Sequence, residues 1–142
     1  MTDSNKITSF RGKYFFLSNF YPCFVNFEGA RYPSVEHAFQ AAKTLNLNDR
    51  KSFEVIRAAS EAKRAGRQVS LRSDWDEVRE SVMLQCLRSK FSNEDLRKML
   101  ISTGDTILEE GNNHGDKFWG TVNGQGDNRL GKLLMKVREE IR

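Results

Sequence analysis

The sequence is poor in the residues that build disulfide bonds and metal sites. Among its 142 residues, two are cysteine and two are histidine. Cys23 and Cys86 lie far apart and form no Cys-x-x-Cys pair, and neither stands near a histidine at the spacing of zinc ligands. We therefore expect two reduced, buried thiols, and neither a metal ion nor another cofactor.

Long hydrophobic runs are also absent. The first ten residues, MTDSNKITSF, are polar and lack the apolar stretch of a secretory signal, and no run approaches the length that spans a bilayer. We therefore expect a cytoplasmic protein without a membrane partner. A chain of 142 residues is long enough for one ordinary domain and short for two, so we expect a single domain over residues 1–142.

The net charge of +4 is unevenly distributed along the chain. Residues 50–72 carry seven Lys or Arg against two Glu. Such a concentration of positive charge attracts phosphates or nucleic acid. It is also what solvated helix faces look like, and charge alone favours this second interpretation.

Proline occurs twice, each time in the first quarter of the chain. Apolar and polar residues otherwise alternate in this part of the sequence. Cys23, Val25 and Phe27 fall on one side of a strand before a turn at Glu28 and Gly29, the pattern of a short hairpin. We expect strands and turns over the first 32 residues. Helical periodicity dominates afterwards, so the predicted fold class is mainly α (α+β), multi-helical, with a few short strands near the N-terminus.

The first predicted helix is capped by Ser34 and buries a stripe of apolar residues. A Ser-x-x-Asp capping box at Ser73 predicts another helix with Trp75, Val78, Val82 and Cys86 on its inner face. A second such box starts a helix near Asn93. Further helices are expected at 49–59, at 60–66 and from about Asp127 to the end of the chain.

The polar side of the first predicted helix has two possible explanations. Glu36, Gln40 and Lys43 cluster roughly 120° from the apolar stripe, where a helix forms the wall of a cleft. Glu36 and Lys43 would lie roughly 10 Å apart along the axis, with room for a ligand between them. The alternative is an exposed stripe supported by an i, i+4 hydrogen bond. His37 points to another side, and we interpret it as structural.

Glycine, asparagine and aspartate crowd residues 104–126, around Phe118 and Trp119, which marks the most promising functional loop. Backbone N–H groups at the following helix start either hold a phosphate or form an ordinary flexible entry. Trp119 is the better candidate for stacking on a base, whereas the position of Trp75 favours the core. The segment FLSNFYP, residues 16–22, is either a self-packed loop or an aromatic pocket.

Three stretches, FLSNFYP, YPSVEHAFQAAK and DKFWGTVNGQGDNRLGKLLMKVREEI, together resemble the YbiA-like or NADAR family of N-glycosidases linked to NAD and ADP-ribose. The resemblance covers nearly the whole chain. It implies a compact, mostly helical domain with a few short strands. It also implies hydrolysis of an N-glycosidic bond between ribose and a base-like amine.

The resemblance implies two substrate classes: ADP-ribose attached to guanine in nucleic acid such as DNA, and phosphoribosylamino pyrimidine intermediates of riboflavin synthesis. Our main expectation is an enzyme that acts on the first class, ADP-ribosylated guanine. The alternative outside the enzymes is a protein that binds ADP-ribose without cleaving it. A cognate ADP-ribosyltransferase toxin is a possible partner. The catalytic residues expected from the resemblance are Glu36, Lys43 and Asp116. The expected substrate-binding residues are Ser18, Asn19, Phe20, Tyr21, Gln40, Arg64, Arg67, Trp75, Trp119, Gly120, Asp127 and Asn128.

Overall fold

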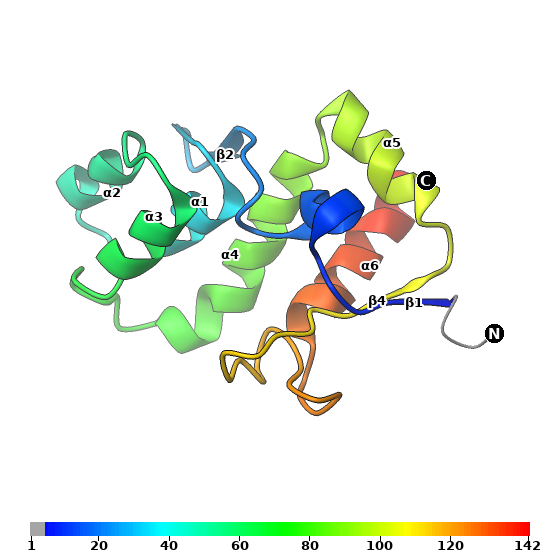
Figure 1. Cartoon of the computed structure of the whole chain (residues 1–142). Helices are drawn as coiled ribbons and strands as arrows, with labels where there is room; N and C mark the ends of the chain where they lie inside the picture. Colours follow the sequence, from blue (N-terminus) through cyan, green and yellow to red (C-terminus); the bar gives the residue numbers. More distant parts are fainter. Residues whose placement is uncertain (1–4) are drawn as a thin grey trace. The chain divides into compact units, whose positions relative to one another are not determined.

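The computed structural model describes residues 5–142 (Figure 1). Contacts divide them into two units. The central unit is Asn19–Ser92, and the terminal unit is the described part of Met1–Ser18 together with Asn93–Arg142. A single domain over the whole chain stays a prediction.

The central unit opens with the predicted hairpin. Strands β2 (Val25–Phe27) and β3 (Ala30–Tyr32) pair antiparallel. Glu28 and Gly29, at the turn, have positive φ angles of 45° and 85°. Two consecutive positive φ angles give the turn type whose twist matches that of the flanking strands. The predicted hairpin and its turn are confirmed.

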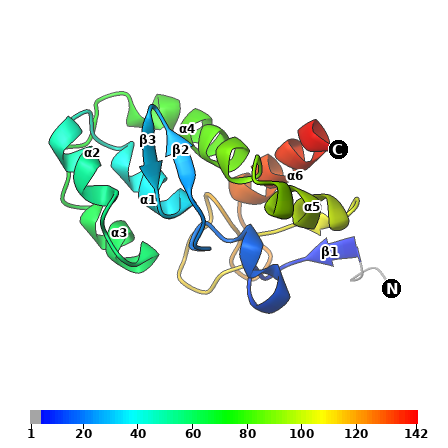
Figure 2. The ribbon, with the colours of Figure 1, turned by 90° about the horizontal axis from the view of Figure 1, so that it is seen from above.

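Helix α1 (Val35–Ala41) lies at the heart of the central unit. It packs against α2 (Leu47–Phe53), α3 (Ala59–Ala65), α4 (Trp75–Lys90) and both strands of the hairpin (Figure 2). Every residue of α1 is buried. A helix surrounded in this way has no solvent face, so its polar side chains must find partners inside the protein.

Two helix boundaries in the central unit differ from the prediction. The helix expected over 49–59 spans Leu47–Phe53, and beyond its end the Ile56 carbonyl accepts a hydrogen bond from His37 Nε2 at 2.9 Å. The predicted capping box at Ser73 is wrong. The N-cap of α4 is Asp74, whose carboxylate is engaged by Arg72, with Nε to Oδ1 at 2.7 Å.

The terminal unit contains a small parallel sheet, in which β1 (Lys6–Ile7) pairs with β4 (Ile107–Leu108). A 3-10 helix, η2 (Gly12–Leu17), stands where strands and turns were expected. Strand β4 corrects the expectation that strands occur near the N-terminus alone. Its partner lies about a hundred residues earlier in the chain, so no local sequence pattern predicts this strand.

Two helices complete the terminal unit. Helix α5 (Glu94–Ser102) is capped by Asn93, which accepts from Leu96 N at 3.0 Å, so the cap is not Ser92 as the second predicted box required. Helix α6 (Arg129–Ile141) begins two residues later than expected and buries the predicted apolar face, including Leu134 and Val137.

The fold class is mainly α with a few short strands, as predicted. Cys86 is buried and Cys23 half-buried, and both are free thiols. None of the helices in residues 5–142 combines the length and the apolar character that a membrane crossing requires.

Candidate functional site

The start of α1 is fixed by hydrogen bonds that place Glu36. The Ser34 hydroxyl accepts from His37 N at 3.1 Å, and the Asn19 carbonyl accepts from Glu36 N at 3.0 Å. The Glu36 side chain therefore leaves the first turn of a capped helix. Glu36 is only 7% exposed, which is unusual for a carboxylate.

Gln40 holds this carboxylate one helical turn later. Its Nε2 donates to Glu36 Oε2 at 2.7 Å, and Gln40 is itself 5% exposed. The i, i+4 hydrogen bond of the simpler sequence interpretation exists, but the stripe is buried rather than exposed. Among the described residues, Gln40 Oε1 has no hydrogen-bond partner. A buried acceptor without a donor is costly, and a ligand N–H would satisfy it.

Lys43 follows α1 instead of lying on it. The helix ends at Ala41, and Lys43 N donates to Gln40 O at 3.2 Å in the turn that comes next. The prediction of Glu36 and Lys43 on one helix line is therefore wrong in detail. The Lys43 carbonyl accepts from Arg72 N at 2.7 Å, which anchors the turn.

Burial and the neighbouring charges both shift the pKa of the Lys43 amine. Burial lowers its pKa most, Glu36 raises it, and Arg67 and Lys63 lower it further. The structure thus brings Glu36, Gln40, Lys43 and Arg67 into one cluster. Lys63 belongs to the same cluster and was not predicted. It joins the cluster through the packing of α3 on α1, which no local sequence pattern predicts.

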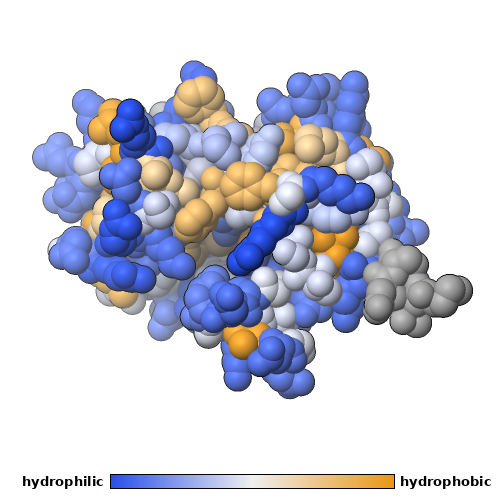
Figure 3. Space-filling model, viewed as in Figure 1, coloured by the Kyte–Doolittle hydropathy of each residue, from blue (hydrophilic) through white to orange (hydrophobic). Residues whose placement is uncertain are grey.

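Among the other basic residues of the segment 50–72, Arg50 is buried, and the rest are half-buried or exposed. Arg64 lies on the solvent side of α3. Figure 3 shows that the surface over α2 and α3 is mostly hydrophilic in this view. This agrees with the interpretation of much of the segment as solvated helix faces, with Lys63 and Arg67 as the members that act on Lys43.

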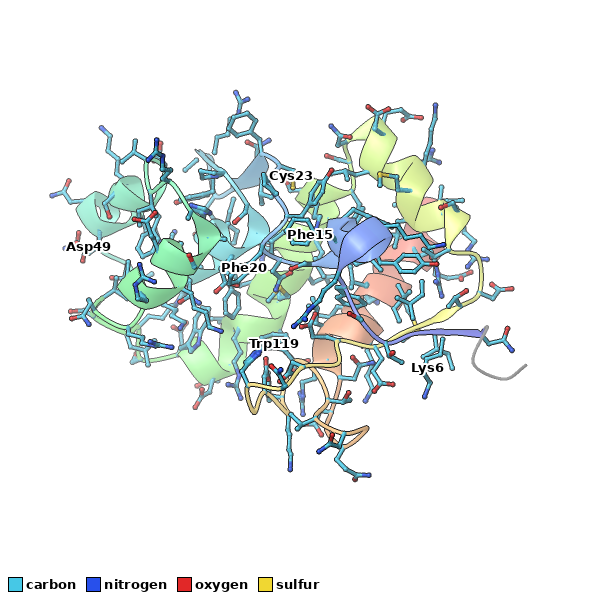
Figure 4. The ribbon with its side chains drawn as sticks, viewed as in Figure 1. Lys6, Phe15, Phe20, Cys23, Asp49 and Trp119 are labelled. Carbon is cyan, nitrogen blue, oxygen red and sulfur yellow. The ribbon has the colours of Figure 1, made fainter. Side chains whose placement is uncertain are left out.

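Other predicted site residues of the central unit line the interior. Trp75 is 7% exposed and packs on Phe39 of α1, with ring centroids 5.0 Å apart. Asn19 Nδ2 lies 3.7 Å from Met83 Sδ, and its Oδ1 is a buried acceptor with no partner among the described residues. Phe20, labelled in Figure 4, and Tyr21 are half-buried.

His37 is structural, as interpreted from the sequence. Its Nε2 donates to the Ile56 carbonyl at 2.9 Å, so Nδ1 is the acceptor and takes a hydrogen bond from the Ser34 hydroxyl at 2.7 Å. Burial lowers the His37 pKa. Both ring nitrogens are occupied, which leaves neither for a substrate.

In the terminal unit, Asp116 organises the glycine-rich loop. One carboxylate oxygen, Oδ1, accepts from Phe118 N at 3.1 Å and Trp119 N at 2.9 Å. Its backbone N donates to Asn112 Oδ1 at 3.0 Å. Asp116 therefore sets the position of Trp119, and its catalytic role stays a prediction.

Asn128 joins the loop to β4. Its Oδ1 accepts from Glu110 N and its Nδ2 donates to Leu108 O, each at 3.0 Å, and its φ angle of 51° is left-handed. The backbone N–H groups of residues 127–130 all donate to carbonyls of residues 117–120. The expectation that N–H groups at this helix start are free to hold a phosphate is therefore wrong.

The other predicted residues of the terminal unit lie in or beside defined turns. Trp119 is half-buried and makes an edge contact with Phe118, with centroids 4.9 Å apart. Gly120 is buried, and a Cβ there would overlap the Glu110 carbonyl. Asp127 is exposed, and Ser18 is half-buried. Within residues 5–142, no three His, Cys, Asp or Glu side chains gather as a metal site would need.

Comparison with known proteins identifies the family. Residues 8–142 match the model of the NADAR domain. The chain belongs to the NADAR family. It is 41% identical over 133 residues to an N-glycosidase of Nostoc punctiforme, covering 89% of this chain and 85% of that protein. It is 38% identical over 129 residues to the N-glycosidase YbiA of Escherichia coli K12, covering 88% and 80% respectively.

Another relative and a solved structure extend this result. A riboflavin biosynthesis protein of Vibrio vulnificus is 43% identical over 132 residues, which are 89% of this chain, and the match spans 35% of that longer protein. The NMR structure of E. coli YbiA matches with a TM-score of 0.82 at 36% identity, covering 95% of this chain and 82% of that one. The relatives of this chain thus include proteins named as N-glycosidases and a protein named for riboflavin biosynthesis.

Proposed function

We propose that this chain is an N-glycosidase that removes ADP-ribose from ADP-ribosylated guanine in nucleic acid. The observation that carries the proposal is the buried Glu36 carboxylate, held by Gln40 in the same cluster as a lysine whose pKa is lowered. A module that merely binds ADP-ribose has no need of a desolvated acid and an activated amine together.

Glu36 suits the cleavage step. Breaking the bond between C1′ and the base nitrogen builds positive charge on the ribose, and a carboxylate in a site from which water is largely excluded stabilises that charge strongly. The same carboxylate can take a proton from an attacking water. Gln40 Nε2 donates to Glu36 Oε2, which fixes the orientation of this carboxylate.

Lys43 suits covalent catalysis, because a lowered pKa increases the share of neutral, nucleophilic amine at a given pH. The Nζ lone pair attacks C1′, the C1′–N bond breaks, and the base departs with a proton. The C1′–O4′ bond then opens and leaves an imine between Lys43 and C1′. Water, losing a proton to Glu36, adds to the imine, the amine leaves, and the sugar closes again. Direct attack by water activated by Glu36 is the competing route.

Charge supports a phosphate-bearing substrate. Lys63 and Arg67 lie close enough to Lys43 to lower its pKa, and a diphosphate would meet both cations. The unpartnered Gln40 Oε1 would accept from an N–H of the base. Both features suit the diphosphate and the base edge of ADP-ribosylguanine.

A second substrate is favoured by one comparison. The Vibrio relative is named a riboflavin biosynthesis protein, as is a chloroplastic maize relative that is 35% identical over 124 residues. A phosphoribosylamino pyrimidine carries one phosphate and the same kind of C1′–N bond. The same cluster would then act on a smaller substrate.

Parallel incubations test the reaction and the substrate. ADP-ribosylated guanine DNA and the phosphoribosylamino pyrimidine are each mixed with the protein, and sugar release is followed. Glu36→Gln should lower turnover at least tenfold, about 1.4 kcal/mol of barrier, with binding largely retained. Glu77→Gln, an exposed position on α4, is the matched control. Release from neither substrate would refute the proposal.

Borohydride distinguishes the two routes, since it reduces an imine to a stable amine. Treatment during turnover should leave a sugar-derived mass on the peptide that contains Lys43. Lys43→Arg should abolish both the adduct and the activity. Steady turnover without an adduct, together with substantial activity of Lys43→Arg, would leave direct attack by water.

A further inference from the structure

The terminal unit has a cavity of its own, which contains neither Glu36 nor Lys43. It has a volume of about 680 Å³ and lies between β1 with the residues after it, η2, and the end of α5. Small-molecule sites commonly occupy roughly 300–1,000 Å³. The cavity is therefore large enough for a nucleotide.

The lining of this cavity is positively charged. It includes Lys6 and Lys13, and its described residues include no Asp or Glu. Lys6, which projects from β1 in Figure 4, forms an ion pair with Glu109 at 3.4 Å, outside this lining. Lys13 Nζ lies 5.1 Å from the centroid of the Tyr14 ring, another lining residue. An aromatic face and an amine thus share one wall.

A buried arginine stands behind the opposite wall. Arg138 is 5% exposed, and its guanidinium NH1 donates to Thr103 Oγ1 at 2.9 Å and Thr106 O at 2.8 Å, both from lining residues. Asp105 and Glu139 act on Arg138 through space, but no carboxylate among the described residues hydrogen-bonds to it.

The charge of Arg138 is therefore poorly compensated. Burial lowers its pKa most, and Arg142 lowers it further, yet a guanidinium stays protonated in proteins. Its buried Nε also has no partner among the described residues. An anion in the adjoining cavity would offset a buried positive charge that the fold otherwise leaves with neutral oxygen partners.

We propose that this cavity is a second binding site, which takes the phosphate of a mononucleotide-sized ligand. Lys6 and Lys13 approach the phosphate, with Arg138 supplying a fixed positive field from behind Thr103 and Thr106. Thr8 and Ser9, also in the lining, offer hydroxyl donors, and the Tyr14 ring offers a surface for stacking. The site is independent of the proposed glycosidase reaction.

Titration of the ¹⁵N-labelled protein with AMP, adenosine and inorganic phosphate tests the proposal. AMP should shift the amide signals of residues 6–14 and 102–106. Phosphate should shift the same signals more weakly, because it lacks the ring, and adenosine should leave them unmoved. AMP shifts confined to residues 36–67, or adenosine binding as tightly as AMP, would overturn the proposal.

Charge reversal supplies the matched variants. Lys13→Glu and Lys6→Glu, both at exposed positions, should each weaken AMP affinity at least tenfold. Lys98→Glu makes the same charge change at an exposed position of α5 outside the lining and should change affinity less than twofold. Equal losses in the three variants would mean a general charge effect and would also overturn the proposal.

Discussion

At the scale of single residues, the central unit couples an acid to an amine. Glu36 raises the pKa of Lys43, while Arg67 and Lys63 lower it. The neutral amine is the reactive form of Lys43. The surrounding cations favour this form, whereas the Glu36 carboxylate favours the protonated form. Mutation of any of these neighbours therefore moves the pH profile of Lys43.

Replacing Arg67 by glutamine should move the pH–rate profile. Arg67 disfavours the protonated amine, so its loss raises the pKa of Lys43 and shifts the rising limb of kcat to higher pH. The measurement is kcat from pH 6 to 10. Arg64→Gln is the control, and it should leave the limb in place whatever its effect on KM. A limb that stays fixed or moves to lower pH in Arg67→Gln would contradict the assignment.

The sequence predicts part of this cluster. The sequence alone shows an acid and an amide, Glu36 and Gln40, which are spaced i, i+4 beside an apolar stripe. Their burial is not visible in the sequence, because it comes from α2, α3 and α4 closing around α1. Gly66 and Lys63 were missed for the same reason: they join the cluster through the packing of α3 on α1, which has no local signature.

At the scale of elements, the contact of α3 with α1 depends on Gly66. This residue has a helical φ of −61°, which any amino acid adopts, so the backbone does not require glycine. Space requires it, since a Cβ at Gly66 would overlap Gln40 Oε1 and lie 3.1 Å from Gln40 Cβ. Gly66 thus makes room for the amide that holds Glu36.

Gly66→Ala should displace the Gln40 amide without straining the backbone. We expect kcat to fall about tenfold as Glu36 loses its partner, and stability to fall by roughly 1–3 kcal/mol from overpacking. Turnover and urea denaturation measure the two effects. In a Gln40→Ala background, most of the obstructing atoms are gone, and the stability cost of Gly66→Ala should drop by more than half. An unchanged cost would place the clash elsewhere.

Several local signals predicted elements correctly, although the two capping boxes did not predict the N-caps of α4 and α5. The hairpin turn, the Ser34 cap and the apolar faces of α1 and α6 follow from neighbouring letters. The start of α6 does not, because loop carbonyls of residues 117–120 take up the N–H groups on which a phosphate site was predicted. That pairing depends on a loop folded back by Asn128, whose side chain reaches β4.

At the scale of the whole molecule, buried charge links pH to stability. Lys90, at the end of α4, is fully buried, and burial lowers its pKa from 10.5 to about 8, partly offset by Cys23. The unfolded chain therefore binds more protons than the folded one between about pH 8 and 10.5, and stability rises with pH in that window. Cys86 acts in the opposite direction above about pH 9, because burial raises its pKa to about 12.

Comparison of the parent with Lys90→Met separates the contribution of the lysine to pH-dependent stability from that of the thiols, because both proteins keep Cys23 and Cys86. The free energy of unfolding of each is measured in urea from pH 6 to 10.5. The parent should gain stability relative to the variant as pH rises above about 8, by a total approaching 3 kcal/mol, because one pKa unit corresponds to about 1.4 kcal/mol. Below pH 8 the difference should be flat. Lys98→Met, at an exposed site, should track the parent throughout. A constant difference between parent and Lys90→Met up to pH 10.5 would show that Lys90 keeps an ordinary pKa despite its burial.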